Sequence, residues 1–473
     1  MRRLFLIIAM LVLAALACQL GSPEVEPTSE AEVLPPTNTA PPPDTEATSP
    51  PPSATLPPTE PGEATEAPTQ PPTSAELPPE IAMQMNAIQQ QVIDLRGLEP
   101  TGDVPRALLS PDELRQRVID DFMADYTAED SFEDGVILSA FGLLEADFDI
   151  GAFYIELLSE QVAGFYDNEA KEMFVVQGEG FFGPERLTYS HEYTHVLQDQ
   201  TYDIENGLDY NDDSCEADTE RCAAIQALIE GDASLVELSW FYQFSTQDDQ
   251  EQIMAFYESY TSPTFDSAPP FMRQDFVFAY NQGLVFVQSL YDEGGWEAVD
   301  AAYRNVPVST EQILHPELYP SDTPIPVELP DLAPVLGEGW RELDRNVMGE
   351  WYTYLILGYG IDPAAQIEDA VAAEAAAGWG GDTYLVYYND ATAQTVVVMR
   401  TTWDTRADAG QFTEAFHDYA EARFGVDTQG PDSAMTWTFS GGYATLLQDG
   451  AETTWVLAPD AATAQLALGA LGQ

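Results

Sequence analysis

The stretch Thr188-Tyr189-Ser190-His191-Glu192-Tyr193-Thr194-His195-Val196-Leu197 carries the pattern His-Glu-x-x-His. In a helix, His191 and His195 are four residues apart and therefore lie on one face. Two imidazoles placed in this way can hold one zinc ion, and Glu192 can then reach a water molecule on the open side of the metal. The alternative is a surface helix that carries two unrelated histidines.

A third metal ligand is expected on a second helix, which the apolar pattern predicts at 219–239. Glu230 is a carboxylate within this apolar run, and a buried carboxylate needs a partner such as a metal ion. The alternative is a carboxylate near a helix end, in water. His-Glu-x-x-His on one helix followed by a glutamate on another resembles the gluzincin type of zinc metallopeptidase. The metzincin extension is absent, because no histidine follows His195 at its spacing.

The resemblance implies a zinc-dependent hydrolase of peptide or protein substrates, in which Glu192 acts as general base. It also implies residues that orient the ligand imidazoles, for which Asp232 and Asp199 are the candidates. His315 is a candidate donor to the developing oxyanion, although a structural histidine is the more common role. A different class of function remains open, namely a non-catalytic zinc-containing binding lipoprotein. The presence of Glu192 argues against it, because a purely structural site needs no base.

Residues 1–18 have the features of an export signal. Arg2 and Arg3 precede an apolar run that is too short to span a bilayer comfortably and that ends at Cys18. This segment resembles a bacterial lipoprotein signal, which implies lipid on Cys18 and a place in the cell envelope, on the outer side of the cytoplasmic membrane. A plain cleaved signal peptide is the alternative. Residues 19–79 are rich in Pro, Thr and Glu and predict a disordered spacer.

The charge of the chain restricts its partners. The formal net charge is −65, and Lys171 is the only lysine. No basic face can form, so binding to nucleic acid is not expected. Adhesion to an anionic membrane by charge is not expected either, which leaves the lipid on Cys18 as the predicted contact with the membrane.

The hydrophobic pattern predicts an α+β fold with two folded domains. Residues 80–317 read as a mainly helical, zincin-like domain with a small sheet, because a hairpin is expected at 162–176 among helical runs such as 134–160. Residues 318–340 are rich in proline and read as a linker. Residues 341–473 read as a small α+β domain of unknown role, in which 434–447 is expected to be one strand.

Cys215 and Cys222 are the cysteines that remain after Cys18, and export predicts a disulfide between them. Seven helical residues would separate them by about 10 Å, which is too far for a bond. If the bond forms, Cys215 must therefore precede the helix that carries Cys222.

An acidic loop precedes this helix. Asp209, Asn211, Asp213 and Glu220 fall at positions 1, 3, 5 and 12 of an EF-hand-like pattern, which makes Ca²⁺ a second candidate cofactor. Ser214 stands where that pattern needs glycine. A solvated acidic loop that caps a helix is the more common structure for such a sequence.

Overall fold

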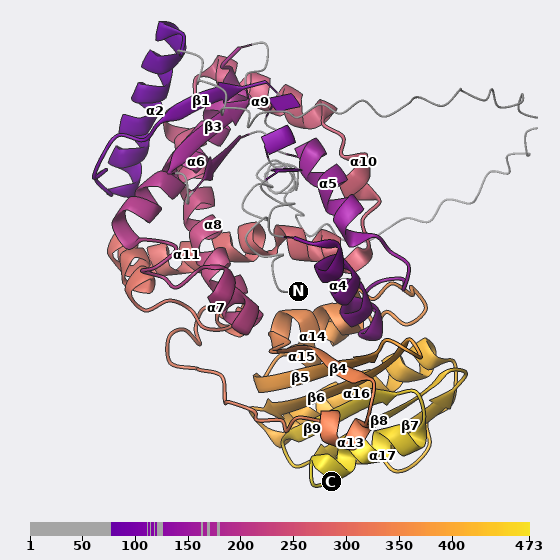
Figure 1. Cartoon of the computed structure of the whole chain (residues 1–473). Coiled ribbons are helices and arrows are strands. Elements are labelled where there is room, and N and C mark those ends of the chain that lie inside the picture. The colour runs from indigo at the N-terminus through magenta and orange to yellow at the C-terminus, as the bar shows by residue number, and fades with distance from the viewer. Residues whose placement is uncertain are drawn as a thin grey trace, which may run out of the picture.

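Three long helices form the centre of the N-terminal region in the computed structural model: α6 (Gly183–Tyr202), α8 (Thr219–Gln243) and α11 (Pro270–Arg304) (Figure 1). Helix α8 is buried along most of its length. It approaches α11 closely because Gly231 and Gly283 face each other, and a Cβ on either would overlap the backbone of the other helix. This close packing keeps the middle of α8 away from solvent.

The structure describes residues 77–473, apart from 111, 114, 118, 121–125, 162–163, 168–170 and 177–179. The predicted signal peptide, Cys18 and nearly all of the spacer lie outside the described residues. No helix in the described part of the chain combines the length and the apolar character needed to cross a membrane.

Shorter helices surround this centre. Two of them, α4 (Ala128–Ala140) and α5 (Ile150–Gln161), replace the single helix expected at 134–160. The chain turns between them at Gly142, which has a φ of 83°. A break inside α11 at Gly294 and Gly295 separates two helical runs. The shorter helices are α2 (Pro79–Arg96), α4 (Ala128–Ala140), α5 (Ile150–Gln161), α7 (Asp212–Ala217), α9 (Gln247–Ser259), α10 (Pro263–Asp266) and α12 (Thr310–Leu314).

A three-stranded sheet lies beside α6. The expected hairpin is present as β2 (Gly164–Asp167) and β3 (Glu172–Val176), which pair antiparallel. A third strand, β1 (Arg106–Leu109), pairs parallel with β3, so that β2 is an edge strand. The sequence pattern did not indicate β1, which is only four residues long.

The C-terminal region is a six-stranded antiparallel sheet with the order β4-β5-β6-β9-β8-β7. The strand expected at 434–447 is two strands, because the chain reverses at Gly441, which has a φ of 95°. The strands are β4 (Trp340–Asn346), β5 (Trp379–Asn389), β6 (Gln394–Trp403), β7 (Ala434–Phe439), β8 (Gly442–Asp449) and β9 (Glu452–Ala458). The helices are α13 (Ala333–Leu336), α14 (Gly349–Gly358), α15 (Asp369–Ala376), α16 (Arg406–Phe424) and α17 (Ala461–Ala470).

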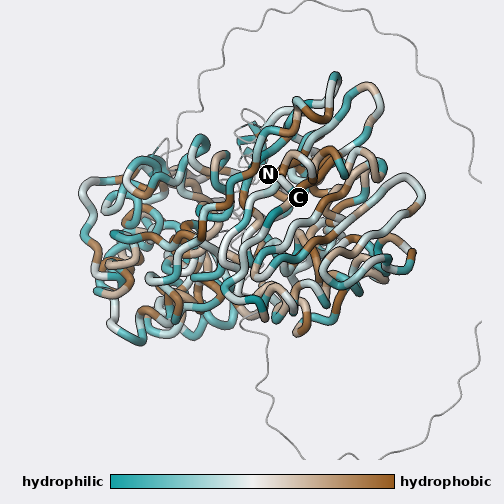
Figure 2. The backbone as a smooth tube through the Cα atoms, turned by 90° about the horizontal axis from the view of Figure 1, so that it is seen from below, coloured by the Kyte–Doolittle hydropathy of each residue, from teal (hydrophilic) through white to brown (hydrophobic). Residues whose placement is uncertain are grey.

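Both faces of this sheet are covered. In β5, Tyr384 and Val386 belong to one buried cluster, whereas Leu385 and Tyr387 belong to another on the opposite face. Residues of α16 lie in the first cluster and residues of α17 in the second. Hydrophobic segments accordingly run through both regions of the molecule in Figure 2.

The two regions share a hydrophobic core. Phe141, which follows α4, packs edge-on against Tyr384 and Trp455 of the sheet, with ring centroids 5.3 and 5.5 Å away. The predicted fold class is confirmed: a mainly helical region with a small sheet is followed by an antiparallel sheet domain with helices.

Candidate metal centre

Helices α6 and α8 bring the three predicted metal ligands together. His191 and His195 lie on the face of α6 that meets α8, where Glu230 projects between them. One ligand atom from each residue lies within 4.8 Å of the other two, and all three side chains are buried. Helix α6 begins at Gly183-Pro184, and the Glu185 carboxylate accepts a hydrogen bond from the Phe182 N–H at this end.

The distances between these atoms match the size of a zinc site. Oε2 of Glu230 lies 3.2 Å from Nε2 of His191 and 3.5 Å from Nε2 of His195. Ligands at about 2.0–2.1 Å from a tetrahedral zinc ion are separated by about 3.3–3.4 Å. The two distances from Glu230 to the imidazole nitrogens therefore match edges of such a tetrahedron, and the third ligand pair lies within 4.8 Å.

Hydrogen bonds on the far side of the rings fix which nitrogen faces Glu230. The amide nitrogen of Gln198 donates to the Ile229 carbonyl at 3.0 Å and to Asp232 at 3.1 Å. The amide oxygen of Gln198 must then face His195, whose Nδ1 lies 2.8 Å away and acts as donor. Nε2 of a neutral His195 consequently presents a lone pair to the Glu230 carboxylate.

His191 is held in the same way. Its Nδ1 lies 3.2 Å from the Glu237 carboxylate, which can only accept while ionised, so Nε2 again presents a lone pair to Glu230. Three lone pairs that converge in a buried space repel one another unless a cation or additional protons lie between them. Burial disfavours the charged imidazolium of His191, but a proton on Nε2 in place of a cation donates to Glu230, and this hydrogen bond and the one to Glu237 raise the pKa of His191. The donor set of two imidazoles and one carboxylate fits zinc.

Glu192 lies next to this group and is itself buried. Its Oε2 accepts a hydrogen bond of 2.9 Å from the backbone N–H of Tyr166 in β2. Its Oε1 is buried and has no hydrogen-bond partner within the described part of the chain. Burial raises the pKa of Glu192 to about 7, against the opposing effect of the two histidines. The carboxylate is thus held by one oxygen and free to accept a proton with the other.

The residues that orient the imidazoles differ from those predicted. Asp232 reaches His195 only through Gln198, and it is itself held by Nε of Arg96 at 2.8 Å and by the Tyr303 hydroxyl at 2.8 Å. The direct partners, Gln198 and Glu237, were missed in the sequence. Their spacing could have indicated them, because Glu237 lies two helical turns after Glu230 and Gln198 one turn after His195.

The other predicted orienting residue, Asp199, contacts different groups. Its carboxylate accepts from the Tyr166 hydroxyl at 2.7 Å and pairs with Lys171 at 2.7 Å. Since β2 and the turn after it supply these donors, Asp199 attaches the hairpin to α6 rather than orienting a metal ligand.

The structure places His315, the predicted oxyanion donor, in contact with Glu350 of the C-terminal region. The residue follows α12, and its Nε2 lies 2.9 Å from Glu350 of α14. The hydrogen bond to Glu350 raises the pKa of His315. His315 therefore joins the two regions of the chain as a structural histidine.

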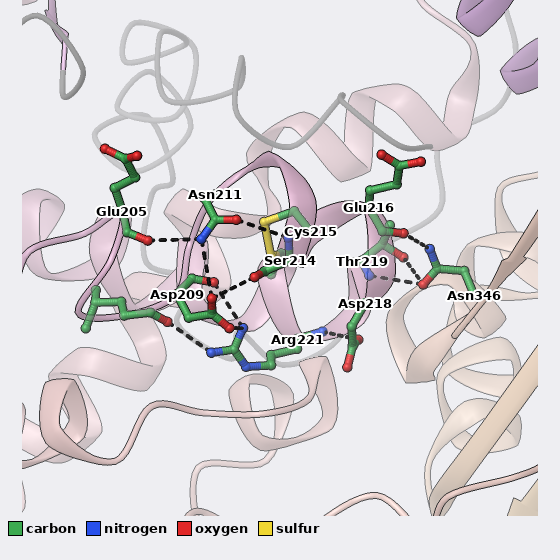
Figure 3. The surroundings of a disulfide bond; sticks show 12 residues. Glu205, Asp209, Asn211, Ser214, Cys215, Glu216, Asp218, Thr219, Arg221 and Asn346 are labelled. Carbon is green, nitrogen blue, oxygen red and sulfur yellow. Dashed lines mark hydrogen bonds and ion pairs between the residues drawn. A yellow bond between two sulfur atoms is a disulfide. The ribbon is translucent and has the colours of Figure 1, made fainter.

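The predicted calcium loop is not formed. Asn211 caps α7 by accepting from the Ser214 N–H at 3.1 Å, and Asp209 accepts from the Ser214 hydroxyl at 2.7 Å (Figure 3). Glu220 is buried in α8, where its Oε1 accepts from the Thr310 hydroxyl at 2.8 Å. Asp209, Asp213 and Glu220 do not gather their carboxylates at one point in the described structure, because Glu220 faces α12. The loop caps a helix instead, which was the alternative expectation.

The predicted disulfide between Cys215 and Cys222 is present, with 5.4 Å between the two Cα atoms (Figure 3). Cys215 lies in α7, before α8 starts, as the geometry of a single helix requires. The chain changes direction at Asp218, which caps α8 by accepting from the Arg221 N–H at 2.9 Å.

Comparisons with known proteins reach only the C-terminal region. A family described as a domain of unknown function, DUF8575, matches residues 336–467, which cover nearly all of the six-stranded sheet domain. No curated protein and no solved structure matches the chain. The candidate metal centre lies outside the matched residues, in the N-terminal region.

Proposed function

We propose that the protein is a zinc-dependent hydrolase of peptide bonds, held at the outer side of the cytoplasmic membrane by a lipid on Cys18. One observation carries the proposal of catalysis. Two imidazole lone pairs and the Glu230 carboxylate converge beside the unpaired, buried Oε1 of Glu192. A purely structural zinc site would gain nothing from a buried carboxylate that is held beside its ligands with one oxygen lacking a donor.

The residues of the chain fit the roles that this chemistry requires. Zinc, when bound, lowers the pKa of a coordinated water and polarises a carbonyl group. Glu192 accepts the proton of the attacking water at Oε1 and then passes it to the leaving amine. Burial raises the pKa of Glu192, which favours its return of the proton to the leaving amine. The Tyr166 N–H keeps the other oxygen in place.

The strand beside Glu192 suits an extended peptide substrate. β2 pairs with β3 on one side only, and Tyr166 faces Met173 in that pair. The Met173 N–H donates to the Pro105 carbonyl next to β1, so Tyr166 and Met173 form the non-hydrogen-bonded kind of pair. The Tyr166 N–H therefore points outward from the sheet, toward Glu192. Since Glu192 holds the Tyr166 N–H, an extended peptide backbone pairs with the other outward-facing backbone groups of this edge.

The proposal is tested by peptide cleavage. The full-length protein, purified in detergent, is incubated with a peptide library, with and without a chelator, beside Glu192→Gln. We expect cleavage by the wild type only, its loss on chelation and its return when zinc is added back. A wild type that contains one equivalent of zinc and cleaves no peptide would instead support a non-catalytic binding lipoprotein.

A further inference from the structure

A second group of acidic residues lies where α12 and the loop after it meet the C-terminal sheet. Glu311 lies in α12, Asp322 in the following loop, and Asp404 directly after β6. One carboxylate oxygen from each lies within 4.8 Å of the other two. We call these three residues the acid cluster. It shares no residue with the zinc centre.

The buried member of the acid cluster lacks a partner. Glu311 is only 2% exposed, and its Oε1 has no hydrogen-bond partner in the part of the chain that the structure describes. Within that part, the acid cluster forms no ion pair with arginine or lysine. Burying a carboxylate without a donor or a cation is unfavourable, so this arrangement requires either a proton or a bound cation.

A fourth carboxylate increases the negative charge at this place. Glu350 of α14 is 4% exposed; its Oε1 accepts from His315, whereas its buried Oε2 has no partner among the described residues. Burial, followed by the charges of Glu350, Asp404 and Asp322, raises the pKa of Glu311 to about 8.

We propose that the acid cluster binds a calcium ion that joins α12 to the C-terminal sheet. Three carboxylates are the hard oxygen ligands that Ca²⁺ prefers, whereas zinc favours nitrogen and sulfur. Opposite ligands at 2.3–2.6 Å from Ca²⁺ lie up to about 5 Å apart, which accommodates the spacing of the acid cluster. Asp322 is half-buried and Asp404 is exposed, so water can complete the coordination. A cation held here offsets the charge of the buried Glu311 carboxylate.

The test uses full-length, zinc-loaded protein from which calcium has been removed. Calcium chloride is titrated by calorimetry, and thermal unfolding is followed with and without 5 mM Ca²⁺, which is about fivefold above the highest expected Kd. The variants are Glu311→Gln and Asp404→Asn, and the matched control is Glu338→Gln, an exposed acid outside the acid cluster. Zinc content is measured in every sample, so that a failure of the zinc centre is recognised separately.

We expect one equivalent of Ca²⁺ to bind the wild type with a Kd of about 10⁻⁴–10⁻³ M and to raise Tm by a few degrees. Both cluster variants should bind at least tenfold more weakly and lose the Tm shift, whereas Glu338→Gln should keep both. Absence of calcium binding to the wild type would overturn the proposal. So would an equal Tm shift in Asp404→Asn, which would indicate general screening of the negative charge. If calcium has no effect on the wild type and Glu311→Gln is more stable than the wild type, a proton and not calcium occupies the site.

Discussion

The amide oxygen of Gln198 lies 2.8 Å from Nδ1 of His195, while the amide nitrogen is held by Asp232 and the Ile229 carbonyl. The Gln198 amide, the Asp232 carboxylate and the Ile229 carbonyl thus determine the tautomer of His195. Asp232 is in turn paired with Arg96 of α2, so the orientation of His195 depends on a helix that lies about a hundred residues earlier in the chain. The candidate metal centre is supported by packing between α2, α6 and α8, beyond its three ligands.

Removing the Gln198 amide should weaken zinc binding without removing a ligand. We expect Gln198→Leu to bind zinc about 10–100-fold more weakly, because His195 can then rotate or adopt the other tautomer. Competition with a chromogenic chelator measures the affinity. Gln243→Leu, at the exposed end of α8, serves as the control and should bind zinc like the wild type. Equal affinities for the two variants would contradict the role of Gln198.

Substitutions of the metal ligand Glu230 and of the base Glu192 should have different effects on zinc content and on cleavage. Glu230→Ala deletes a zinc ligand, so both zinc content and peptide cleavage should fall. Glu192→Gln leaves all three ligands, so zinc should stay while cleavage falls by about 10²–10⁴, the usual contribution of a general base. Metal analysis and cleavage rates are measured side by side. Cleavage by Glu192→Gln at the wild-type rate would exclude the mechanism, and full zinc in Glu230→Ala would exclude that ligand.

The sequence predicted those parts of the molecule that depend on local spacing. His191 and His195 share a helix face by periodicity alone, and Glu230 was recognisable as a charge within an apolar run. Elements of this kind carry their own signal.

Contacts between distant segments carried no such signal. The sequence could not show which of Asp199 and Asp232 lies near a ligand imidazole. Asp199 pairs with Lys171 and Asp232 with Arg96, and other elements supply both of these partners. Glu220 matched a calcium position by number, yet the packing of α8 against α12 directs it to Thr310. The acid cluster could not be predicted at all, since its members come from three segments.

The disulfide should survive purification and stabilise the region around α7. Mass spectrometry without reduction should recover the peptides of Cys215 and Cys222 linked to each other. The double substitution of both cysteines by alanine should lower the free energy of unfolding by about 2–3 kcal/mol, as expected for a short closed loop. Denaturant unfolding measures the difference. Free thiols at both positions in the native protein would contradict the bond.

The lipid anchor is testable by one substitution. Cys18→Ser removes the sulfur that would carry lipid, so the protein should move from the membrane fraction to the soluble fraction of the cell envelope. Fractionation followed by immunoblotting measures the distribution, and Ser22→Ala, in the spacer, is the control. If Cys18→Ser stays with membranes as the wild type does, lipidation is not the anchor.

Asp275 should make the protein more stable as the pH falls from neutral. This buried carboxylate of α11 accepts from the Tyr352 hydroxyl at 2.6 Å and from the Trp351 indole at 2.9 Å, and burial raises its pKa to about 6. The folded state then binds the proton more tightly than the unfolded state, whose aspartates titrate near 3.9. Stability is therefore gained as the pH falls through about 6, and the gain is complete below the unfolded value.

The variant Asp275→Asn cannot titrate and should lack this gain. Between pH 8 and pH 3, the difference in free energy of unfolding between wild type and variant should change by about 3 kcal/mol in favour of the wild type. Denaturant unfolding across this pH range isolates the effect, because the other acidic groups are common to both proteins. Asp266→Asn, at an exposed aspartate, should follow the wild-type curve. Parallel curves for Asp275→Asn and the wild type would mean that Asp275 titrates normally in the folded protein.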